Sequence, residues 1–101
     1  MILLIITAIH EFEKDIRKML KQSGVISYSY YPVTGHKDDD TQSNSDNWFA
    51  GGPIESDSVM FQVFTRPENG DQLIEHARAF NAKQETINHI HIVKLAVSDV
   101  G

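Results

Sequence analysis

The fold class depends first on residues 2–24, which read ILLIITAIHEFEKDIRKMLKQSG. Residues 2–6 form a short apolar run rich in β-branched side chains, which is typical of a strand buried on both faces. From Glu11 to Gln22 the apolar residues recur with a helical period. Ser23-Gly24 then indicates the end of this helix, because glycine adopts a positive φ just past a last turn. The stretch therefore predicts a strand followed by a helix.

The rest of the chain continues this order of elements. Residues 25–33 alternate between apolar and polar as a strand does, and the proline among them favours an edge of the sheet. Residues 58–65 have strand character, a helix is expected from Pro67 to near residues 81–83, and residues 89–97 alternate again. The order predicts an α+β, ferredoxin-like βαββαβ sandwich, with one antiparallel sheet and two helices on one face.

The predicted strands carry apolar side chains on both faces, although two helices cover only one. The chain is expected to form a single domain over residues 1–101, and so small a domain gains from burying surface against other chains. A second copy of the chain is the simplest cover for the other face. The pattern therefore predicts a homo-oligomer.

The charge of the chain is concentrated in residues 36–57. This insert holds six acidic side chains and one lysine, which equals the net charge of −5 of the whole chain. The acidic balance argues against nucleic-acid binding, and no apolar stretch approaches the about 20 residues that span a bilayer. The chain contains no cysteine, which excludes disulfides and thiolate metal sites. We therefore expect a cytoplasmic protein with a long polar loop between its second and third strands.

Val33-Thr34-Gly35 ends the second predicted strand directly before the long polar insert. This arrangement resembles the PII-like superfamily of trimeric signalling proteins, which place a Val-x-Gly segment at the base of an extended T-loop. The resemblance extends from Ile2 to Val97. It implies a ferredoxin-like homotrimer that binds a small effector in the clefts between subunits and signals through the loop. The targets that it implies are membrane transporters or metabolic enzymes.

One feature distinguishes this chain from the classical PII proteins. PII proteins bind adenine nucleotides partly through a Gly-Asp-Gly-Lys segment after the second helix, whereas this chain has residues 84–88, QETIN, there. The expected effector is therefore a small anion, with an adenine nucleotide as one member of that class. CutA-like trimers share the fold and offer the alternative of a divalent-metal-binding protein.

The expected effector site consists of Thr34, Gly35, His36 and Lys37. A glycine at the base of a loop lets the backbone approach a ligand closely, and Lys37 is the only cation of the insert. The alternative is that Gly35 serves a turn and that Lys37 is a solvated counter-charge.

His89 and His91 are the metal-site candidates. They occupy positions i and i+2 of the last predicted strand, so they share a face about 7 Å apart. Imidazole nitrogens are common ligands of divalent metals, and a trimer would arrange three copies of this pair around its axis. Val93, Leu95 and Val97 lie on the same face, so packing of the histidines at a subunit interface is the alternative.

Asn47, Trp48 and Phe49 form the candidate partner-binding part of the insert. A Trp-Phe pair in a polar segment favours docking onto another molecule, because aromatic side chains anchor interfaces. The alternative is that the pair packs back onto its own trimer. No Ser-His-Asp set or Gly-rich phosphate loop is present, so we expect no enzyme activity, with small heme-degrading or isomerase-like ferredoxin folds as the alternative.

Overall fold

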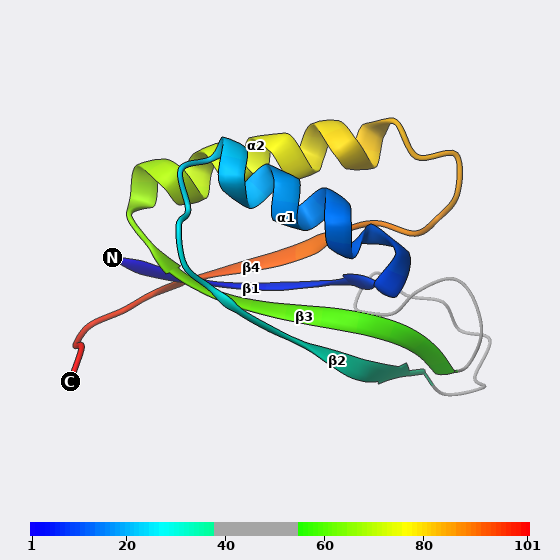
Figure 1. The fold of residues 1–101 in the computed structure, drawn as a ribbon, viewed down its shortest axis with the longest axis horizontal. Coiled ribbons are helices and arrows are strands. Elements are labelled where there is room, and N and C mark those ends of the chain that lie inside the picture. Colours follow the sequence, from blue (N-terminus) through cyan, green and yellow to red (C-terminus); the bar gives the residue numbers. More distant parts are fainter. Residues whose placement is uncertain (38–54) are drawn as a thin grey trace.

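The computed structural model describes residues 1–37 and 55–101 as an antiparallel four-stranded sheet with two helices (Figure 1). The elements are β1 (Ile2–Ile9), a 3-10 turn η1 (His10–Phe12), α1 (Glu13–Gln22), β2 (Ser29–His36), β3 (Glu55–Thr65), α2 (Pro67–Ala82) and β4 (His91–Ala96). The strand order is β2-β3-β1-β4, and both helices lie over the same face of the sheet (Figure 1). The predicted α+β class is thus confirmed.

The core lies between the helices and one face of the sheet. β1 pairs with β3 and with β4, and its even-numbered side chains face the helices. Leu4 and Ile6 are fully buried there, and so is Phe61 on β3. The residues of α1 that the sequence places on one face, Ile16, Met19 and Leu20, close this core from above. This side of the sheet contains most of the buried apolar surface.

The other face of the sheet, which we call the open face, carries the odd-numbered residues of β1 and their cross-strand neighbours. Leu3 and Ile5 are half-buried there within one chain, so their full burial stays a prediction that depends on a second subunit. Phe64 on β3 is 56% exposed and Leu95 on β4 is 41% exposed. These side chains form an apolar area at the end of the sheet where β1 begins.

All four strands differ in their bounds from the sequence-based expectation. β3 begins at Glu55 rather than at residue 58. β1 continues to Ile9, because residues 7–9 pair with β3. β2 begins at Ser29 rather than at Val25, and it occupies the sheet edge that its proline indicates. β4 spans residues 91–96 instead of 89–97.

The end of α1 explains the late start of β2. Val25 N–H donates to the carbonyl oxygen of Leu20 at 3.0 Å, and Gly24 N–H donates to that of Lys21 at 3.1 Å. These are the two hydrogen bonds of a Schellman motif, with Gly24 at φ +80°. Val25 is therefore buried against the helix that it terminates, which confirms the predicted helix stop and corrects the predicted strand.

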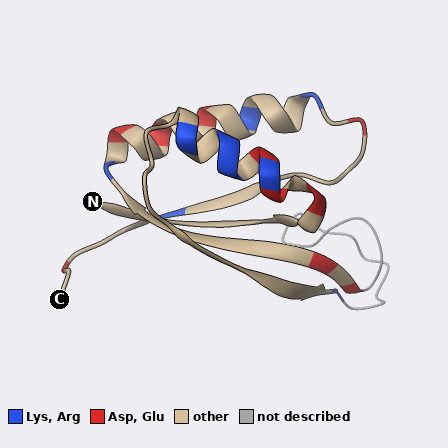
Figure 2. Ribbon diagram, in the orientation of Figure 1, with Lys and Arg blue, Asp and Glu red and all other residues tan. Residues whose placement is uncertain are grey.

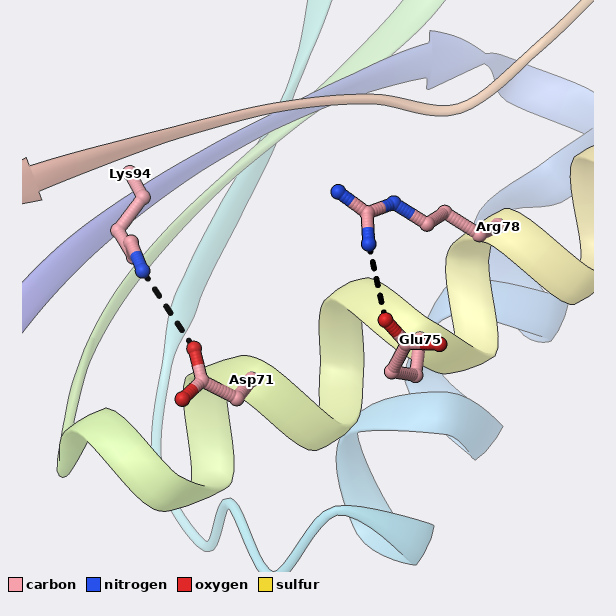
Figure 3. Close-up of polar contacts among 4 residues, drawn as sticks. All are labelled: Asp71, Glu75, Arg78 and Lys94. Atoms are coloured by element: carbon pink, nitrogen blue, oxygen red, sulfur yellow. Dashed lines mark hydrogen bonds and ion pairs between the residues drawn. The ribbon is translucent and has the colours of Figure 1, made fainter.

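The second helix begins at Pro67 and ends at Ala82, as expected. Its Phe80 ring packs edge-on against Phe12 at 4.9 Å between ring centroids. Lys94 of β4 reaches up to Asp71 of α2, with 3.4 Å between ammonium nitrogen and carboxylate oxygen (Figure 3). No helix among the described residues is both long enough and apolar enough to cross a membrane.

Asn81 joins the end of α2 to the approach of β4. Its side-chain amide donates to the Ile90 carbonyl at 2.9 Å, and its amide oxygen accepts from the Ile90 N–H at 2.8 Å. The side chain thus pairs with the backbone as a neighbouring strand would. Because Ile90 is only 4% exposed, water does not readily replace this pairing.

Asn81→Ala is expected to lower the free energy of unfolding by about 2 kcal/mol, because two buried backbone groups of Ile90 lose their partners. Urea unfolding of the two proteins measures this difference. Asn88→Ala is the matched control, since the Asn88 side chain makes no hydrogen bond within the described part of the chain. Equal losses in the two variants would contradict the structural role of Asn81.

Candidate functional site

The ends of β2 and β3 project beyond the rest of the sheet. β1 stops at Ile9, which pairs with Ser58, whereas β3 begins three residues earlier at Glu55 and pairs there only with β2. We call residues 34–36 and 55–57 the β2–β3 ribbon. It lies at the end of the sheet next to η1, where α1 begins (Figure 1). The ribbon corrects the expected loop bounds of 36–57, because both ends of that insert belong to strands.

The four predicted effector residues lie on or directly after this ribbon. Thr34 and His36 share the face that the helices cover, whereas Gly35 faces the other way and is buried. His36 Nδ1 lies 3.7 Å from a carboxylate oxygen of Glu55, its cross-strand neighbour. Lys37 is half-buried and follows the last residue of β2. The segment therefore presents its side chains to two sides of the ribbon.

A pocket of about 420 Å³ lies at the base of the ribbon. Its lining residues come from the start of η1 and from both β2 and β3: His10, Pro32, Val33, Thr34, Asp57 and Ser58. Thr34 and Asp57 are directly opposite one another across β2 and β3. Of the four predicted effector residues, only Thr34 belongs to this lining.

The pocket has a polar wall. His10 Nδ1 lies 3.8 Å from a carboxylate oxygen of Glu13, which places one acid–imidazole pair at its edge. Asp57 adds an exposed carboxylate, and the hydroxyl oxygens of Ser58 and Ser56 are 3.2 Å apart. This wall provides hydrogen-bond acceptors as well as hydroxyl donors. It suits a ligand that carries donor groups of its own.

The sequence did not single out His10 and Asp57 for binding. They are far apart in the chain and meet only because β1 pairs with β3, with Ile9 opposite Ser58. Besides Thr34, the sequence signal near this pocket is the proline of β2, and it indicates strand position rather than a ligand.

The two metal-site candidates lie at the opposite edge of the sheet. His91 is half-buried on the open face, directly across from Thr7. Burial lowers the pKa of His91, and the nearby His89 lowers it further. Both effects favour the neutral imidazole, which is the form that binds metals. Across residues 1–37 and 55–101, however, no three histidine or carboxylate side chains gather closely enough to hold an ion.

Thr7 adds a polar group to the same place. Its hydroxyl oxygen is buried and makes no hydrogen bond with another described residue.

The predicted partner-binding residues Asn47, Trp48 and Phe49 lie outside the described residues.

The fold has a counterpart among solved structures. The crystal structure of a DUF3240 family protein from Shewanella baltica OS155 matches with a TM-score of 0.66 over 99% of this chain and 92% of that one. Sequence identity between the two is 12%, so the likeness concerns the fold alone. No protein-family model and no curated protein sequence matches the chain.

Proposed function

We propose that the protein is a non-enzymatic, PII-like sensor with a ferredoxin-like fold, which acts as a homotrimer and binds a small anionic effector. The effector site lies at the base of the 36–57 insert, in the cleft between subunits. Binding changes how the insert presents Asn47, Trp48 and Phe49 to a partner protein. The pocket at the base of the β2–β3 ribbon is the observation that carries this proposal.

The open face supports the assembly. Phe64, Val93 and Leu95 are large apolar side chains that are each more than one third exposed, and they lie on neighbouring positions of the sheet. Apolar area of this kind is stabilised when a second chain removes it from water. A closed ring of identical subunits covers this face in every copy.

The ribbon supports the location of the effector site. Its residues pair on one side only, so this part of the sheet is the least constrained by its neighbours. A ligand in the pocket contacts both strands of the ribbon through Thr34 and Asp57. Ligand binding there restrains the two points at which the insert leaves the sheet.

The charges around the pocket specify the effector further. Asp57 lines the pocket and repels an anion from that part of the wall, whereas Lys37, the only cation of the insert, follows β2 outside this lining. The effector therefore carries its negative group toward Lys37 and hydrogen-bond donors toward Asp57 and Thr34. Adenine nucleotides meet both requirements, since they combine phosphates with amino and hydroxyl groups.

Lys37→Ala is expected to abolish effector binding. A ligand that binds only the native protein at 100 times its Kd adds about 2.7 kcal/mol to stability, and the variant loses this gain. Melting temperatures with ATP, ADP and bicarbonate measure it, and the emission of Trp48, the only tryptophan, gives a second readout. Lys83→Ala is the control, because Lys83 follows the last residue of α2 and does not line the pocket.

A divalent-metal-binding trimer of the CutA type is the second candidate function. The observation that favours it is the half-buried His91 whose neutral form His89 supports. The test compares the melting temperatures of the wild type and of Lys37→Ala. If zinc raises both equally and no anion raises either, the effector proposal is wrong and the metal proposal is supported.

The proposed targets are membrane transporters or metabolic enzymes, and the proposed location is the cytoplasm. The absence of cysteine from the chain agrees with a reducing compartment. The high acidity of the insert agrees with a protein rather than a nucleic acid as its target.

A further inference from the structure

Four of the nine cationic side chains of the protein lie on α1, a helix of ten residues. They are Lys14, Arg17, Lys18 and Lys21, which we call the α1 basic ridge. The spacing i, i+3, i+4, i+7 places them on one side of the helix. This side is turned away from the buried residues of α1, and Figure 2 shows its basic segments along the outer surface of the helix.

The ridge is not neutralised by its surroundings. Lys14, Lys18 and Lys21 are exposed, and none of them forms an ion pair with a described residue. Only Arg17 has a carboxylate near it, that of Glu13 at 3.9 Å. The like charges of Lys14 and Lys18 are one helical turn apart and repel each other.

Helix stability explains only part of this arrangement. Lys18 and Lys21 lie toward the C-terminal end of α1, where cations interact favourably with the helix dipole. Lys14 lies in the first turn, where a cation meets the positive end of the dipole and is unfavourable. A role in folding therefore does not account for the whole ridge.

Arg17 is held in place by aromatic side chains of β2 and the segment before it. Its Nε donates to the Tyr28 hydroxyl at 3.3 Å, and its guanidinium carbon lies 5.2 Å from the centre of the Tyr30 ring. The Tyr30 ring stacks in turn on Phe61 of the core. The hydrogen bond to Tyr28 is the largest of the effects that raise the pKa of Arg17. The ridge thus contains one cation held by neighbouring side chains and three exposed lysines that form no ion pair with a described residue.

The shape of the helix layer limits what fits on the ridge. α2 runs beside α1 in the same layer and carries exposed Glu68, Asp71 and Glu75, visible as its acidic segments in Figure 2. A flat anionic membrane pressed against this layer meets Glu68 as well as the ridge, together with Asp71 and Glu75, which pair with Lys94 and Arg78. The net charge of −5 repels both a membrane of this kind and a DNA duplex. An acidic partner no wider than one helix contacts the ridge without approaching the carboxylates of α2.

We propose that the α1 basic ridge binds a short acidic helix of a partner protein. Carboxylates spaced by one helical turn on that helix match the spacing of the lysines on α1, so several charge pairs form along two adjacent helices. This interface is separate from the effector pocket, and it needs neither the trimer nor the 36–57 insert.

The test uses a fluorescein-labelled alanine-based helical peptide of about 18 residues with four glutamates on one face, in low salt where exposed charges are least screened. Fluorescence anisotropy with the full-length protein measures binding. We expect Lys14→Gln/Lys18→Gln to weaken binding about tenfold, because it removes two exposed charge pairs. Arg78→Gln/Lys83→Gln removes the same charge from α2 and is expected to change binding less than about twofold.

A second peptide of the same composition, with its glutamates distributed around the helix, is expected to bind about tenfold more weakly. Equal binding by both peptides, equal loss in both variants, or no binding of the first peptide at low salt overturns the proposal. Lysine-dependent binding to vesicles containing phosphatidylserine or to a DNA duplex, tighter than to the peptide, assigns the ridge to a different anion and overturns it too. Circular dichroism melting verifies that both variants remain folded.

Discussion

Replacing Phe61 by alanine is expected to lower the free energy of unfolding by about 3–5 kcal/mol. Phe61 is fully buried at the centre of β3. Its ring lies 5.2 Å from that of Tyr30 and 5.7 Å from that of Tyr28, measured between centroids. The substitution leaves a cavity beneath both tyrosines, and the surrounding sheet cannot collapse into it without losing strand pairing.

Urea unfolding at a fixed protein concentration measures this loss, from the change in midpoint at constant slope. Ile26→Ala is the control, because Ile26 is 97% exposed and its truncation is expected to change stability by less than about 0.5 kcal/mol. A loss for Phe61→Ala below about 1 kcal/mol would show that the core is not organised around this ring. Phe61 supports the tyrosine that holds Arg17. Peptide binding by Phe61→Ala, measured by fluorescence anisotropy, therefore tests whether the core positions Arg17.

Phe64→Glu is expected to separate the proposed trimer into single chains. Phe64 is 56% exposed on the open face, and a buried carboxylate without a partner costs several kcal/mol in each subunit. Light scattering is the measurement. We expect the wild type at three times the 11.4 kDa of the chain and the variant at that mass itself.

Ile26→Glu is the control for this experiment, because Ile26 is equally apolar but lies between α1 and β2, away from the open face. A wild type that scatters as one chain would contradict the trimer. A trimer that tolerates Phe64→Glu would place its interface on another surface. Either result leaves the proposal for the α1 basic ridge unaffected, since the ridge belongs to one chain.

The helices were the most predictable part of the fold, because the signals that end them are local. The helical period from Glu11 and the stop at Ser23-Gly24 agree with α1, apart from a first turn that is a 3-10 helix. Pro67 marks the first residue of α2. In each case the deciding interactions join residues within one turn of each other.

The strand ends were less predictable, because pairing between distant segments decides them. The alternation of apolar and polar residues from Val25 onward is typical of a strand. Val25 belongs instead to the end of α1, because its backbone N–H donates to the Leu20 carbonyl and its side chain is buried. His36 and Glu55 are polar and show no strand pattern, yet each is ordered as the cross-strand neighbour of the other. Local pattern carries no information about such pairs.

The candidate site shows the same division. Thr34 was predicted from its position before the insert, and it does line the pocket. His10 and Asp57 were not predicted, because only the register of three strands brings them to one place. The spacing of the α1 lysines is visible in the sequence, whereas their lack of neighbouring carboxylates depends on how α2 lies beside α1.

The position of β1 has a consequence for the kinetics of folding. This first strand lies inside the sheet, and its outer neighbour is the last strand, so that Ile2 pairs with Ala96. Contacts between segments so far apart in sequence form slowly, because closing the long intervening chain costs entropy before any contact repays it. β1, β3 and the helices are able to associate earlier, and the chain then retains an unpaired edge of β1 until β4 arrives. That edge is rich in isoleucine and leucine, so the interval before β4 docks is the period in which the chain is most exposed to aggregation.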